Sequence, residues 1–245
     1  MGKTVFQKTS PNRICQDLVK QIQEAIIEGK LKQGDHLPSQ RELGEIFQTS
    51  RATLREALRV LEDQGLIEIK LGVSGGTRIR GANTDRISDS IGMLIRHRSV
   101  SLNHLMDFRM ILEGFIAEQV CSLANEEDIK DLKLIKNKAK KFLLSEPVDW
   151  KPYTKIDAEF HEALARIAGN PLFKATLKPM YENIHNYFYQ YLPDKPELLI
   201  KENYEDMSQI IKAIEDKNFI DAKKAAMLHV SRFHNLMEEN ELQHT

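Results

Sequence analysis

Three side chains in the second half of the sequence have types and spacing that suit a metal ion. Asp157 and His161 are four residues apart, so on a helix both point from the same face. His229 lies far downstream, and a carboxylate and two imidazoles that meet inside a helical bundle can hold a divalent ion such as zinc. An ordinary hydrogen-bonded surface pair of Asp157 and His161 has the same spacing, so the pattern leaves both interpretations open.

A second group of side chains suits DNA. On a helix over residues 51–64, Arg51, Thr53 and Arg55 share the outer face, where arginine can bridge guanine O6 and N7 in the major groove. Further polar groups precede this helix, and they suit contacts with phosphate: Arg41, Thr49 and Ser50. The alternative for each arginine is a solvated helix face.

These arginines need a scaffold, and the first 80 residues predict one. Apolar residues recur every four positions over 11–32, which predicts an amphipathic helix. Ser39 and Glu42 have the spacing of a capping box for a second, short helix. After the third helix, residues 66–70 and 77–80 are typical of two strands joined by a glycine-rich turn. This order predicts a winged helix-turn-helix over residues 1–81.

The second half, residues 82–245, has a different texture. Helical periodicity is interrupted by short Pro, Gly and Asn breaks, which indicates about seven helices and no strand. The fold class is therefore mainly α: a winged helix-turn-helix with a small hairpin, followed by an all-α antiparallel bundle.

Composition narrows the class of protein. The net charge is −1 and 41% of residues are hydrophobic, and basic residues outnumber acidic ones only within the first 80 residues. The two cysteines have no metal-binding or disulfide spacing. No apolar run reaches the length of a membrane span, so we expect a cytoplasmic protein without a membrane partner.

The front blocks resemble the GntR family of regulators. The resemblance rests on residues 34–43 (GDHLPSQREL), 50–58 (SRATLREAL), 65–67 and 75–77, which agree in order and spacing. It implies DNA contacts by Arg41, Arg51, Thr53 and Arg55, with the wing glycines Gly75 and Gly76 at the tip.

The second half is similar to the FCD ligand-binding domain of FadR-type GntR regulators. The supporting pieces are residues 108–113 (FRMILE), 157–161 (DAEFH), 169–171 (GNP) and 210–216 (IIKAIED). In metal-binding members an aspartate and three histidines form the site, and Asp157, His161 and His229 match three of these positions. The fourth, 22 residues before His229, is Met207, a poor ligand beside oxygen and nitrogen donors. Either three protein ligands hold the ion, or the site has lost its metal.

The same resemblance implies that Arg109 pairs with an effector carboxylate through its bidentate guanidinium. The alternative is an ion pair with Glu113, one helical turn away. Together these features predict a homodimeric transcription regulator, most simply a repressor, that binds a palindromic DNA operator and responds to a small organic acid.

Two other functions deserve comparison with this one. An enzyme could use Asp157, His161 and His229 as a hydrolytic metal site, but the sequence offers no nucleophile–base pair or phosphate loop, so we expect no enzyme. A winged helix can also dock a protein, and DNA association without salt dependence would indicate that use.

Overall fold

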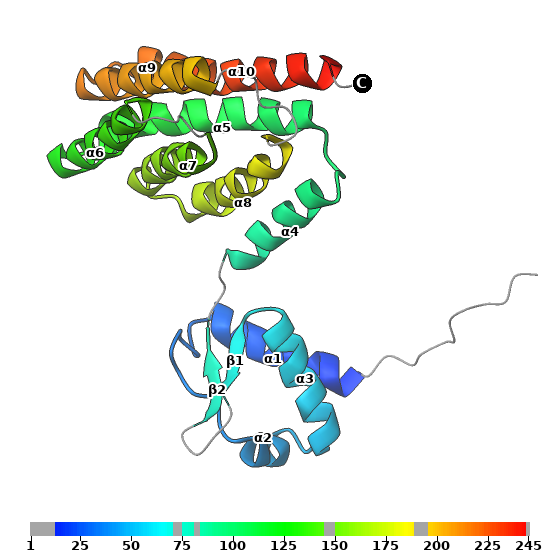
Figure 1. Ribbon diagram of the computed structural model, residues 1–245. Helices are drawn as coiled ribbons and strands as arrows, with labels where there is room; N and C mark the ends of the chain where they lie inside the picture. Colours follow the sequence, from blue (N-terminus) through cyan, green and yellow to red (C-terminus); the bar gives the residue numbers. More distant parts are fainter. Residues whose placement is uncertain (1–12, 71–74, 81–83, 145–149, 189–195, 244–245) are drawn as a thin grey trace, which may run out of the picture. The chain divides into compact units, whose positions relative to one another are not determined.

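The computed structural model describes residues 13–70, 75–80, 84–144, 150–188 and 196–243 (Figure 1). The chain forms two compact units, Met1–Arg86 and Ile87–Thr245. The predicted junction between residues 81 and 82 lies outside the described residues. No helix within the described ranges has the length and apolar character that crossing a membrane requires.

The first unit is the predicted winged helix-turn-helix. Its elements are α1 (Arg13–Ile27), α2 (Gln40–Ile46), α3 (Arg51–Asp63), β1 (Ile67–Lys70) and β2 (Gly76–Ile79). Apolar side chains from all three helices and both strands pack into one core, with Leu54, Leu58 and Leu61 of α3 fully buried. The hydrophobic stripe of α3 thus turns inward, which leaves its opposite face to solvent.

Local signals explain where these helices begin and end. The Ser39 hydroxyl accepts from the Glu42 backbone N–H at 3.3 Å, and the Glu42 carboxylate accepts from the Ser39 backbone N–H at 2.8 Å, so the predicted capping box is confirmed. Ser50 caps α3 through a bond from the Thr53 N–H. Gly65 follows the C-cap of α3 at φ +71°, a conformation that favours glycine.

The second unit contains the seven helices predicted from its sequence, counted over the described residues. They are α4 (Asp85–Arg96), α5 (Leu102–Leu123), α6 (Glu126–Leu143), α7 (Trp150–Ile167), α8 (Pro171–Phe188), α9 (Pro196–Glu215) and α10 (Phe219–Gln243). α10 lies along α5 and α9, and α6 contacts both α7 and α9 (Figure 1). A single large core joins them, and within it several charged and polar side chains are buried: Arg109, Glu113, His161, Asp206 and His229.

A proline in α8 creates the point at which α4 is attached. Pro179 has no N–H, so the carbonyl of Ala175 loses its partner four residues later in the helix. The Ser88 hydroxyl of α4 donates to that carbonyl at 2.8 Å. α4 is thereby tied to α8 at the residue that the proline leaves open.

Candidate functional site

The outer face of α3 carries the predicted arginines. Arg51, Arg55 and Arg59 are all exposed and lie four residues apart, so they form one stripe on the helix. Thr53 is half-buried, and its hydroxyl lies 2.9 Å from that of the capping residue Ser50. Thr49 is also half-buried and immediately precedes the helix. A stripe of free guanidinium groups at this spacing has the reach and donor pattern for base edges and phosphates.

The other predicted DNA contacts lie on neighbouring elements. Arg41, in the first turn of α2, is exposed and forms a surface ion pair with Glu45 at 3.1 Å, a contact too weak to withhold it from phosphate. Gly76 begins β2 and Gly75 precedes it, whereas the wing tip at 71–74 lies outside the described residues. The strand itself is held firmly, because β1 pairs with it on one side and the backbone of residues 34–37 bonds to it as well.

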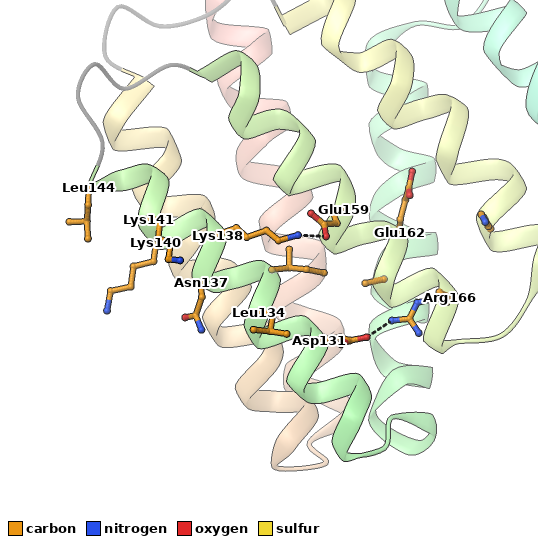
Figure 2. A pocket seen from close by; sticks show the side chains of 13 residues that line it. Asp131, Leu134, Asn137, Lys138, Lys140, Lys141, Leu144, Glu159, Glu162 and Arg166 are labelled. Carbon is orange, nitrogen blue, oxygen red and sulfur yellow. Dashed lines mark hydrogen bonds and ion pairs between the residues drawn. The ribbon is translucent and has the colours of Figure 1, made fainter.

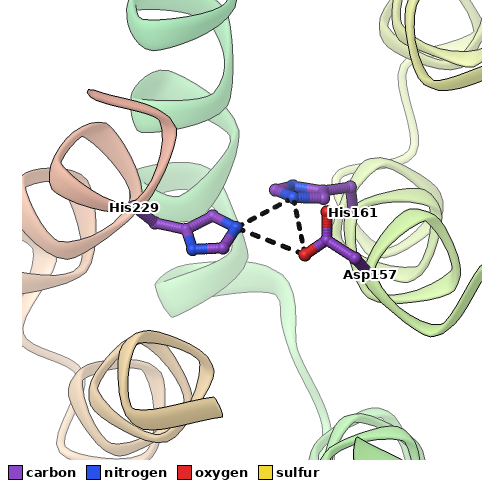
Figure 3. A group of neighbouring side chains, drawn as sticks. All are labelled: Asp157, His161 and His229. Atoms are coloured by element: carbon purple, nitrogen blue, oxygen red, sulfur yellow. Dashed lines mark hydrogen bonds and ion pairs between the residues drawn. The ribbon is translucent and has the colours of Figure 1, made fainter. Parts of the chain in front are cut away.

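The structure brings Asp157, His161 and His229 together inside the helical unit (Figure 3). His161 Nε2 lies 3.1 Å from His229 Nε2. Asp157 Oδ1 lies 3.6 Å from His161 Nε2 and 3.5 Å from His229 Nε2. Both imidazoles are buried, so the i,i+4 pair belongs to an interior cluster and the surface-pair alternative does not apply.

Each histidine has a carboxylate at its other nitrogen. His161 Nδ1 lies 2.5 Å from Glu113 Oε2, and His229 Nδ1 lies 3.5 Å from Asp206 Oδ2. A carboxylate beside Nδ1 favours the tautomer that carries its proton there, which leaves Nε2 as a free donor of electrons. Asp157 is oriented in turn by Asn203, whose amide donates to Oδ1 at 2.7 Å.

The pKa shifts of the cluster follow from these charges. Burial alone would lower the pKa of His229, but its contacts with Asp157 and Asp206 outweigh burial and raise that pKa to about 9. Burial would raise the pKa of Glu113, but the charges of Arg109 and His161 hold it down at about 2. The histidines similarly hold the pKa of Asp157 well below its usual value. The site therefore keeps its carboxylates ionised.

These residues fit a divalent cation. With a proton at each Nδ1, two imidazole lone pairs and one carboxylate oxygen converge within 3.6 Å of one another. Such acceptors repel one another unless a proton or a cation lies among them. Two nitrogens and one oxygen form a donor set that zinc accepts, with a fourth position left for another ligand. Met207 is fully buried in α9, and its neighbour Asp206 is the residue that meets His229.

Comparison with known proteins decides the family. Residues 15–79 match the family described as bacterial regulatory proteins of the gntR family, and residues 104–232 match the FCD domain. The chain belongs to the GntR family. This member combines the family's DNA-binding unit with an FCD effector domain, and it is a transcription regulator rather than an enzyme.

Individual relatives agree with this GntR assignment. The chain is 30% identical to the Uxu operon regulator of Haemophilus influenzae, over 89% of this chain and 80% of that protein. It is 26% identical to the HTH-type transcriptional repressor NanR of Cronobacter sakazakii, over 94% of this chain and 88% of that protein. A solved structure, Streptococcus agalactiae GntR, is 25% identical with a TM-score of 0.67, covering 90% of this chain and 99% of that chain.

Arg109 of this GntR regulator is linked to the cluster through Glu113. Its Nε donates to Glu113 Oε1 at 2.7 Å, so the ion pair with the residue one turn away does form. Its Nη1 meets only the Met106 thioether, at 3.9 Å, which is a weak acceptor. The guanidinium thus keeps donors beyond the Glu113 pair, and it lies 5.1 Å from the centre of the Tyr181 ring.

A separate hollow of about 860 Å³ lies between α6 and α7 (Figure 2). Several of its charges are already neutralised, since Lys138 pairs with Glu159 and Arg166 with Asp131. Its lining includes no residue of the Asp157–His161–His229 cluster. We therefore do not assign the effector to it.

Sequence reasoning missed four residues of the site: Glu113 as the partner of His161, Asn203, Asp206 and Tyr181. Three of them reach the cluster from a different helix than the ligand they touch. The only available signal was their polar character within helices that were otherwise apolar on their inner faces.

Proposed function

We propose that this GntR regulator is a homodimeric repressor that binds a palindromic operator and is released by a small carboxylate held at the Asp157–His161–His229 cluster. The observation that carries the proposal is the convergence of two imidazole nitrogens and a carboxylate on one point, with the Arg109 guanidinium linked to it through Glu113. The name of the NanR relative supports the sign of regulation. A protein that acts on the chromosome of a bacterium belongs in the cytoplasm.

Each part of the site has a role in this proposal. Asp157, His161 and His229 would hold zinc or a similar ion, which supplies a Lewis-acidic partner for a carboxylate oxygen. Arg109 would neutralise the effector's charge with a bidentate contact. Glu113 orients both the guanidinium and the His161 ring, and so connects the two recognition groups.

The helix α8 offers a route from the effector to the DNA-binding unit. Tyr181 of α8 stacks on His161 at 4.9 Å, and the Ala175 carbonyl of the same helix is held by Ser88 of α4. α4 is the helix that follows the winged unit in the chain. An effector that repositions α8 would therefore act on α4, which favours one arrangement of the recognition helices over another.

An operator-binding assay tests the proposed function. DNA fragments selected from the source genome are titrated with the zinc-loaded full chain, with and without a series of small carboxylates. One of these acids is expected to lower operator affinity by roughly 5- to 150-fold, the usual range of allosteric coupling. Operator affinity that no carboxylate changes, in the presence of zinc, would contradict the proposed release.

Zinc binding is expected to strengthen with pH. Below about pH 9 the metal-free protein carries a proton at His229, and zinc must displace it. The apparent zinc affinity should therefore rise by up to about tenfold per pH unit and level off near pH 9. Competition with a chelator of known affinity measures this, and a flat profile from pH 6 to 9 would show that His229 is not a ligand.

An exposed apolar stripe on α5 supports the dimer. Phe108, Ile111 and Phe115 lie on one face of this helix with 45%, 71% and 42% of their surfaces exposed. We expect Ile111→Glu to convert the dimer to a monomer at micromolar concentration, as judged by light scattering during gel filtration. Ile27→Glu is the control, because Ile27 is 83% exposed at the end of α1 and should leave the dimer intact. A dimeric Ile111→Glu variant would place the interface elsewhere.

A further inference from the structure

The Tyr181 hydroxyl is a buried polar group without a hydrogen-bond partner. The residue lies in α8 with 4% of its surface exposed, and no acceptor or donor within the described residues satisfies its oxygen. A buried hydroxyl in this state costs roughly 1–3 kcal/mol relative to a bonded one. Folded proteins seldom retain that cost without a reason, and a ligand that supplies the missing partner is one such reason.

The ring of Tyr181 touches both groups to which the proposed function assigns the effector. It stacks on the metal-ligand candidate His161, with centroids 4.9 Å apart and planes inclined by 19°. The guanidinium carbon of Arg109 lies 5.1 Å from the centre of the same ring. These two contacts fix the ring, and therefore fix the position of its hydroxyl beside the effector site.

The electrostatics keep this hydroxyl protonated. Burial and the neighbouring charge of Glu113 raise the pKa of Tyr181 well above its usual value, although Arg109 opposes them. Tyr181 also lines a hollow of about 370 Å³ between α7 and α8, together with Ala158 and Glu182. The hydroxyl is thus a neutral O–H donor in an interior region bordered by a surface hollow.

From these observations we propose that Tyr181 hydrogen-bonds a second oxygen of the effector, next to its carboxylate, and so selects 2-hydroxy or 2-oxo carboxylates over plain ones. The inference rests on the proposed function, because it takes the carboxylate itself to be bound at Arg109 and the cluster. A site built around a buried donor discriminates against ligands that leave the donor unpaired.

The test compares two small probes that differ by one hydroxyl. Acetate and glycolate are titrated against the zinc-loaded full chain and against its Tyr181→Phe variant by NMR at millimolar concentration. Wild-type protein is expected to bind glycolate about five- to tenfold more tightly than acetate. Tyr181→Phe keeps the ring and its two contacts, so it should bind acetate like wild type and lose the preference for glycolate.

A matched control removes a buried hydroxyl that already has a partner. Tyr153 donates to Asn203 Oδ1 at 2.5 Å, so Tyr153→Phe should lower the melting temperature and leave the glycolate preference intact. A preference for glycolate that survives in Tyr181→Phe would overturn the inference, and so would wild-type protein that binds both probes equally. Wild-type protein that binds neither probe would instead overturn the proposed carboxylate site, and the inference with it.

Discussion

Replacing His229 with alanine is expected to lower zinc affinity about 100-fold or more. Loss of a group that only orients a ligand already costs 10- to 100-fold in metal proteins, and His229 supplies one of three converging ligand atoms. With Nε2 removed, His161 and Asp157 remain as a two-ligand site on a single helix. Calorimetric titration of zinc into the metal-free full chain measures the loss.

The control for this prediction is a histidine outside the cluster. His104 is exposed on α5, so His104→Ala should bind zinc like wild type. The alanine variant also leaves Asp206 beside an empty position, and circular dichroism must show that the helical unit still folds. A folded His229→Ala variant with unchanged zinc affinity would remove the cluster from consideration as a metal site.

Replacing Arg55 with alanine is expected to cost about 1–3 kcal/mol of specific DNA binding, a loss of roughly 5- to 150-fold. Arg55 is the middle arginine of the exposed stripe on α3, and the helix core beneath it consists of Leu54, Leu58 and Leu61. Because the side chain has no part in that core, the melting temperature should not change. Fluorescence anisotropy with operator and scrambled duplexes separates specific from general binding.

The sign of the effect on specificity distinguishes two kinds of contact. If Arg55 bridges a guanine, discrimination between operator and scrambled DNA falls with the affinity, whereas a phosphate contact weakens both duplexes alike and reduces the salt dependence. Arg13→Ala, which removes an exposed arginine from α1, should change neither. Wild-type affinity and discrimination in Arg55→Ala would refute the assignment of α3 as the reading helix.

Short-range signals made most of the fold predictable. The capping box at Ser39 and Glu42, the leucine stripe of α3 and the glycine after it each act within one or two helical turns, and the structure reproduces them. The seven helices of the second unit follow from periodicity for the same reason.

The candidate site was only partly predictable, because its contacts span long stretches of sequence. The i,i+4 relation of Asp157 and His161 is visible in the sequence, but nothing local pairs Glu113 with His161 or Asp206 with His229. The sequence directed attention to Met207, while the residue before it provides the carboxylate. Tyr181 became a candidate only when its ring was seen to stack on His161.

A crystal structure of the full chain grown with zinc, with diffraction recorded on both sides of the zinc absorption edge, tests the central claim most directly. The account predicts one anomalous peak in each helical unit, within bonding distance of Asp157 Oδ1, His161 Nε2 and His229 Nε2. Zinc bound only at surface residues, with these three side chains free of anomalous density, would contradict it.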